Sequence, residues 1–156
     1  MAIEIERKFL LEGDGWRNSV SRSVAMEQAY LGGDGVSIRV RITAEEALIN
    51  IKENRLGQAR EEFEYPVPLD DARRLMALAR RGRVEKIRHY VEHAGTLWEV
   101  DEFQGENHGL VVAEVELEDP RQTFERPPWL GREVTDEERY YNVSLARHPV
   151  CSWGGD

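Results

Sequence analysis

Charged residues of one sign recur at every second position along several segments of this 156-residue chain. Alternate residues of a strand point to the same face, so the side chains of residues i and i+2 stand roughly 6.6 Å apart. The acidic doublets are Glu4 with Glu6, Glu62 with Glu64, Glu99 with Asp101, and Glu114 with Glu116. The basic residues arranged in this way are Arg39 with Arg41 and Lys86 with Arg88, and single bases follow at Lys8 and Lys52.

Like charges at this spacing repel one another, and exposed strand faces usually avoid them as neighbours. Carboxylates that face an enclosed space would be stabilised by divalent cations, which take oxygen ligands. Lys and Arg doublets would be stabilised by phosphate groups. A space that holds both kinds of doublet therefore indicates a metal-bound polyphosphate. For any single strand, an ordinary sheet with its polar face in water is the alternative.

The elements that must position these residues are mostly strands, because the dominant period is two. Strands are expected over residues 2–10, 25–31, 36–43, 47–53, 59–67, 84–92, 96–103 and 110–118. Several of the links have hairpin length, which favours an antiparallel sheet. Helices are expected over 70–81, 136–147 and 121–125. If the sheet closed with its charged faces inward, roughly eight strands would leave room for one small ligand.

Composition bounds the class of protein. The chain has 21 Lys and Arg against 30 Asp and Glu, a net charge of −9, which disfavours loose binding to nucleic acid or to an anionic membrane. No apolar run approaches a membrane span, and the acidic N-terminus is unlike a signal peptide, so a cytoplasmic protein is expected. The length and the lack of a linker predict one domain over 1–156. Cys151, the only cysteine, is expected to be idle.

The sequence resembles the CYTH superfamily, also called the triphosphate tunnel metalloenzymes. Its opening, Glu4-Ile5-Glu6-Arg7-Lys8, matches the family's ExExK signature, and the later charged doublets follow in the family's order over nearly the whole chain. The segment PPWLGREVTDEERYYN is similar to the closing segment of the short bacterial branch. The resemblance implies an α+β fold in which a closed antiparallel eight-stranded barrel forms a tunnel, with a few helices packed outside. The tunnel would hold Mg²⁺ or Mn²⁺ and a triphosphate.

Together, the doublets and the resemblance imply roles for the charged residues. The metal-holding carboxylates would be Glu4, Glu6, Glu114 and Glu116. The bases along the phosphate chain would be Lys8, Arg39, Arg41, Lys52, Lys86 and Arg88, with Arg139 as a further clamp at a tunnel mouth or simply a solvated helix residue. The supporting acids would be Glu62, Glu64, Glu99 and Asp101. In short bacterial relatives, a tyrosine in a QxY pattern paired with a lysine is a proposed proton acceptor, which implies Tyr30 and Lys86; a packed tyrosine is the competing interpretation.

The resemblance further implies metal-dependent hydrolysis of inorganic triphosphate to diphosphate and phosphate. A class IV adenylate cyclase and a thiamine or nucleoside triphosphatase are alternatives on the same fold. A non-catalytic polyphosphate-binding module is an alternative of another class, although clustered glutamates of the metal-binding type favour an enzyme. The expected partner is a small-molecule polyphosphate, not nucleic acid or a membrane, and the thin helical cover leaves room for a homodimer.

Overall fold

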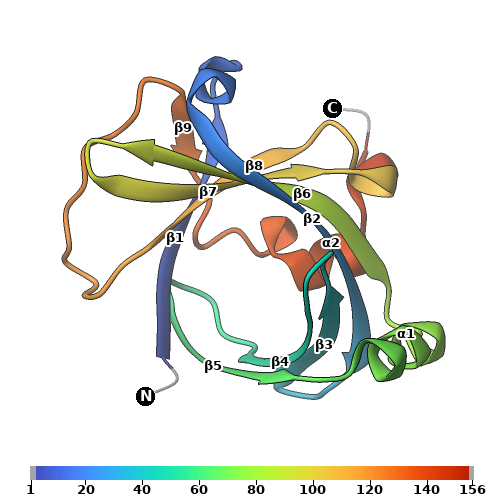
Figure 1. Ribbon diagram of the computed structural model, residues 1–156. Coiled ribbons are helices and arrows are strands. Elements are labelled where there is room, and N and C mark those ends of the chain that lie inside the picture. Colours follow the sequence, from blue (N-terminus) through green and yellow to red (C-terminus); the bar gives the residue numbers. More distant parts are fainter. Residues whose placement is uncertain (1–2, 155–156) are drawn as a thin grey trace.

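A computed structural model describes residues 3–154, and its main feature is a ring of eight antiparallel strands (Figure 1). In chain order the strands are β1 (Ile3–Leu11), β2 (Val20–Gly32), β3 (Val36–Ile42), β4 (Ala47–Glu53), β5 (Ala59–Pro66), β6 (Arg83–His93), β7 (Thr96–Phe103) and β8 (Val111–Glu116). Their order around the ring is β5-β4-β3-β2-β6-β7-β8-β1, and β1 pairs back with β5. The prediction of eight antiparallel strands is thus confirmed, except that position 2 lies outside the described residues.

Strand β1 joins the two ends of the sheet. Its start pairs with β5, with Glu4 opposite Arg60, and its later part pairs with β8, with Glu6 opposite Glu116. Beyond β5, the same edge of β1 pairs with a ninth strand, β9 (Leu130–Glu133), which the period-two pattern did not reveal. Strand β2 also begins five residues earlier than expected.

Apolar residues between the doublets form the outer face, which two separate clusters cover. One cluster packs β1, β7 and β8 against Trp16 and Trp129, and Trp98 lies within it with no exposed surface. The other packs β2, β3 and β4 under α1 (Leu69–Leu78), through Ala72 and Met76. The alternation of the strands therefore directs the charged residues inward.

The C-terminal segment crosses one end of the ring. There the inward positions become apolar, at Val84, Phe103 and Val112, and they pack on Leu145 of α2 (Asn142–Arg147). Figure 1 shows α2 lying across the opening of the ring. Gly82 fixes this contact, because its φ is +99° and a Cβ there would collide with the backbone carbonyl of Ala146.

The helix predictions need three corrections. Helix α1 ends at Leu78 instead of 81, because Ala79 is extended. The helix expected over 136–147 is shortened to α2, and a single 3₁₀ turn, Glu138–Tyr140, precedes it. The prediction of a helix over 121–125 is wrong. That segment has no helix, and its Phe124 packs on Phe9 and Trp98. None of the helices within residues 3–154 is long and apolar enough to cross a membrane.

Candidate functional site

The ring contains a polar cavity of about 300 Å³. Most of the predicted site residues line it, whichever strand they come from. The acids are Glu4, Glu6, Glu62, Glu64, Glu99, Glu114 and Glu116, the bases are Lys8, Arg39, Arg41, Lys52, Lys86 and Arg88, and Tyr30 completes the set. The structure thus brings together residues that are up to 112 positions apart, as Glu4 and Glu116 are.

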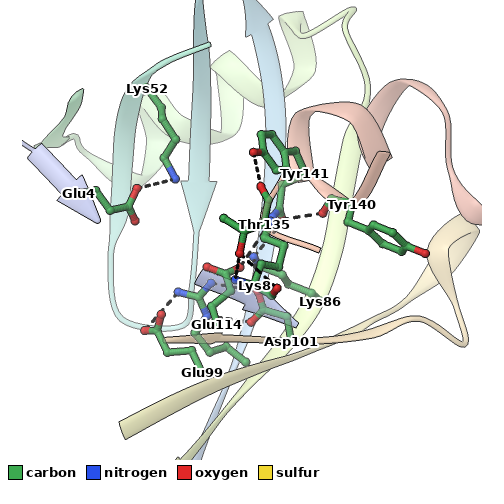
Figure 2. A network of polar contacts seen from close by, with 12 residues as sticks. Glu4, Lys8, Lys52, Lys86, Glu99, Asp101, Glu114, Thr135, Tyr140 and Tyr141 are labelled. Carbon is green, nitrogen blue, oxygen red and sulfur yellow. Dashed lines mark hydrogen bonds and ion pairs between the residues drawn. The ribbon is translucent and has the colours of Figure 1, made fainter. Parts of the chain in front are cut away.

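Asp101 lies behind the lining and holds two of the bases (Figure 2). Its carboxylate is fully buried, accepts a hydrogen bond from Lys86 Nζ at 2.8 Å, and accepts two from the Arg88 guanidinium at 2.8 and 3.0 Å. Burial alone would raise the pKa of Asp101, but the charges of Arg88 and Lys86 outweigh it and hold that pKa well below its usual range. Burial, with the nearby Arg88 and Arg41 charges, lowers the pKa of Lys86 to about 7 despite Asp101. Asp101 therefore holds the side chains of Lys86 and Arg88 behind the cavity wall.

A second group of bases has no carboxylate partner. Within residues 3–154, no acid lies within ion-pair distance of Arg39, Arg41 or Arg60. Among the described residues, the Arg39 side chain donates only to the Tyr30 hydroxyl, at 3.4 Å, and its Nε is buried without a partner there. Arg41 donates to Gln28 Oε1 at 2.8 Å, and burial, with Arg39 and Arg88, lowers the pKa of Arg41 to about 10. Buried cations of this kind favour an anion in the cavity.

Three carboxylates lie close together on the neighbouring strands β1 and β8. Glu6 and Glu116 are directly opposite one another in the β1–β8 register, and Glu114 is opposite Lys8. Burial raises the pKa of Glu114 and of Glu116, and in both cases the neighbouring charge of Glu6 raises it further. Burial likewise raises the pKa of Glu99 to about 7, and Glu114 adds to this while Arg88 opposes it. Like charges in a buried space call for a cation, although no three acidic, His or Cys side chains in the described part of the chain meet closely enough to enclose an ion alone.

Glu4 lies apart from these carboxylates, beside Lys52. Lys52 Nζ is 2.9 Å from Glu4 Oε2 and 3.4 Å from Glu62 Oε2 (Figure 2 shows the first pair). Burial would lower the pKa of Lys52, but Glu6 and Glu4 outweigh it and raise that pKa. Asn50 completes this group by donating to Glu62 at 3.0 Å. Lys52 is therefore a charged base that sits among carboxylates.

Two expected roles do not match the geometry, the phosphate clamp at Arg139 and the pairing of Tyr30 with Lys86, whereas the alternative of a solvated residue fits Arg139. Arg139 is exposed outside the cavity, where its guanidinium lies 3.7 Å from the centroid of the Trp153 ring. The expected pair of Tyr30 and Lys86 is not in contact: in the β2–β6 register Lys86 is opposite Met26, four residues before Tyr30. Lys86 Nζ instead donates to Asn142 Oδ1 at 2.9 Å, in addition to Asp101.

The cavity also contains residues that the sequence analysis missed. Arg60 is buried on β5, and its guanidinium lies 4.7 Å from the ring centroid of Tyr141. It shares the parity of Glu62 and Glu64, so the same alternation could have identified it. Asn142 reaches Lys86 from α2, and no local pattern indicates such a long-range contact. Tyr141 donates to the Thr135 carbonyl at 2.6 Å and accepts from the Gly57 N–H at 3.3 Å, so it ties the C-terminal segment to the start of β5.

Comparison with known proteins places this cavity in a family. The model of the CYTH domain matches residues 2–148. An inorganic triphosphatase of Acetivibrio thermocellus is 40% identical over 151 residues, which is 96% of each chain, and one of Nitrosomonas europaea is 35% identical over 148 residues, covering 92% of this chain and 96% of that one. A solved structure of an inorganic triphosphatase is 34% identical and superposes with a TM-score of 0.67, over 97% of this chain and all of the other. This chain belongs to the CYTH domain family.

Proposed function

We propose that this chain is a metal-dependent inorganic triphosphatase and that its cavity is a tunnel closed by the ring of strands. The observation that carries the proposal is a set of guanidinium groups without a carboxylate partner, the buried Arg39 and Arg60 and the half-buried Arg41, which line the same cavity as clustered glutamates. An elongated polyanion would compensate these cations. The names of the relatives, which match over nearly the whole chain, support triphosphate as that polyanion.

The bases that line the cavity would bind the phosphates. Arg39 and Arg41 come from β3, and Lys86 and Arg88 come from β6, two strands that both pair with β2. Lys8 and Arg60 lie beside Tyr141, the residue before α2. Guanidinium groups match the geometry of phosphate oxygens and stay charged at neutral pH. Binding would relieve the cost of burying the unpaired charges.

A divalent cation fits the opposite side of the cavity. Glu6, Glu114 and Glu116 provide carboxylate oxygens, which Mg²⁺ and Mn²⁺ prefer, and the raised pKa values of Glu114 and Glu116 would return toward normal beside a cation. Magnesium usually takes only one or two carboxylates together with substrate phosphates, so a ready-made cage is not required. When bound, such an ion supplies charge neutralisation at phosphate oxygens. Glu4 would join this set once phosphate draws Lys52 away from it.

Positioning and charge stabilisation supply most of the catalysis in phosphoryl transfer. Asp101 and Asn142 hold Lys86 Nζ in place, and a pKa near 7 allows this amine to exchange a proton at neutral pH. Tyr30 would act through Arg39, which it contacts, rather than through Lys86. We therefore assign Lys86 the proton-handling role and Tyr30 a positioning role.

A substrate panel tests the proposal. The protein is incubated with inorganic triphosphate, ATP and thiamine triphosphate, each with Mg²⁺ or Mn²⁺, and the products are separated. Orthophosphate and diphosphate from inorganic triphosphate at the highest kcat/KM support the proposal, whereas cyclic AMP as the main product from ATP would establish a cyclase instead.

A variant pair tests the metal side of the site. Glu116→Gln should lower metal-dependent phosphate release by about 100-fold or more, since it removes a charged group from the reacting centre. Glu45→Gln, an exposed glutamate in the β3–β4 turn that does not line the cavity, is the control and should leave the rate unchanged. Equal rates for Glu116→Gln and the control would overturn the assignment of Glu116.

A further inference from the structure

A second, smaller cavity of about 170 Å³ adjoins the first at the end covered by α2. Tyr30, Ser37, Asn54 and Val143 line both cavities, so the two cavities adjoin at these side chains. The volume lies below the roughly 300–1,000 Å³ typical of pockets for drug-sized ligands, so it suits a small ion. The second cavity therefore adjoins the proposed active site and is too small for a nucleotide.

All the charged residues of this cavity are basic. Arg81, two residues before β6, lines it together with Arg147 and His148 at the end of α2, and no acid of residues 3–154 does. Within residues 3–154, neither arginine has a carboxylate within ion-pair distance, and neither side chain makes a hydrogen bond. The positive charge of the second cavity is thus uncompensated.

The basic character continues inward from this cavity. Tyr30, which is 2% exposed, accepts a hydrogen bond from Arg39 on its far side, and Arg39 belongs to the bases without a carboxylate partner. The acids at Glu46 and Glu64 lie on the main cavity alone and do not reach the second one. Positive charge therefore lies on both sides of Tyr30, at Arg81 and Arg147 in the second cavity and at Arg39 in the main one. Clefts lined by one sign of charge concentrate ions of the opposite sign and speed their association.

From this arrangement we propose that the second cavity is an anion-binding vestibule that takes inorganic phosphate anions, with Arg81 and Arg147 as the groups that contact them. The inference rests on the proposed function for the identity of the anion, because the main cavity would consume triphosphate and release diphosphate and orthophosphate. The vestibule would concentrate these anions beside α2, next to the main cavity. Its arginines belong to no part of the catalytic machinery described above.

The test compares two double variants with the same change in net charge. Arg81→Gln/Arg147→Gln neutralises the vestibule, and Arg73→Gln/Arg74→Gln neutralises the exposed face of α1, which lines neither cavity. At an ionic strength of about 10 mM, where the Debye length is about 30 Å, the vestibule variant should lower kcat/KM for triphosphate about 10-fold with kcat unchanged. The difference should shrink toward unity at about 0.5 M salt, and the control should match the wild type throughout.

A second measurement does not depend on turnover. Calorimetric titration of the metal-free protein with diphosphate should show, in the wild type and in the control, a weak site beyond the main one that the vestibule variant lacks. Identical isotherms for all three proteins, together with identical kcat/KM at low salt, would overturn the vestibule. Absence of triphosphate hydrolysis in the wild type would instead overturn the proposed function, and the calorimetric comparison would still decide whether the vestibule binds anions.

Discussion

Replacing Asp101 by Asn should destabilise the folded protein more than any other change of a single carboxylate to its amide in this chain. Asp101 is fully buried and forms three hydrogen bonds with two cations, and the amide of Asn cannot balance those charges. Removing one partner of a buried ion pair costs about 3–5 kcal/mol. The lower end applies here, because Lys86 retains Asn142 at 2.9 Å and Arg88 retains Glu99 at 3.4 Å. We therefore expect a loss of about 3 kcal/mol, or roughly 6–12 °C in Tm for a chain of this length.

Glu133→Gln is the matched control, since Glu133 also binds an arginine, Arg7, in a bidentate pair, but on the surface. Exposed pairs of this kind contribute about 0–1 kcal/mol. The free energies of unfolding are measured by urea denaturation of the wild type, the two variants and the double variant Asp101→Asn/Lys86→Met. The double variant should lose less than the sum of its parts, because it also removes a buried cation. A loss below about 1 kcal/mol for Asp101→Asn, equal to that of the control, would refute the reasoning.

Three further predictions concern separate parts of the molecule. Arg60→Gln should raise the KM for triphosphate about 10-fold without lowering the Tm, because it removes an unpaired buried charge; an equal KM for Arg60→Gln and the exposed Arg55→Gln would contradict this. Glu99→Gln should leave the free energy of unfolding of the metal-free protein unchanged at pH 4 and raise it by about 1–3 kcal/mol at pH 8. Burial raises the folded-state pKa of Glu99 to about 7, so the wild type loses stability as the pH rises from 4.5 to 7. Equal pH profiles of stability for the variant and the wild type would refute this prediction. Gly82→Ala should lower the free energy of unfolding by about 1–3 kcal/mol more than Gly109→Ala. Both glycines have φ near +100°, but only a Cβ at Gly82 would collide with backbone, that of Ala146. Equal losses for the two variants would show that α2 moves away without cost and would contradict the prediction.

The charged doublets were accessible to sequence reasoning because strand parity is a local property. Once Arg39 and Arg41, or Glu114 and Glu116, are placed on strands, alternation alone puts each doublet on one face. Arg60 obeys the same rule, so alternation with Glu62 and Glu64 also predicts that it faces the cavity. The hairpin-length links predicted antiparallel neighbours, but the pairings that close the ring, β1 with β5 and β8 and β2 with β6, join strands far apart in the chain, and only the family resemblance implied them.

The C-terminal third was less predictable because long-range contacts shape it. Two hydrogen bonds prevent the segment before α2 from completing a helix. The backbone N–H of Val134 donates to the Lys8 carbonyl, and the Tyr141 hydroxyl donates to the backbone carbonyl of Thr135. The resulting 3₁₀ turn carries Arg139 to Trp153 instead of to the cavity. The contact of Asn142 with Lys86 joins residues 56 positions apart and leaves no trace in local periodicity.

The central claim is that the cavity hydrolyses inorganic triphosphate with the help of a divalent cation. The most direct measurement is ion chromatography of triphosphate incubated with the protein, in EDTA and after addition of Mg²⁺ or Mn²⁺. The claim predicts equal amounts of diphosphate and orthophosphate that appear only with the cation. Triphosphate that remains intact with both cations, or that is cleaved equally well in EDTA, would contradict it.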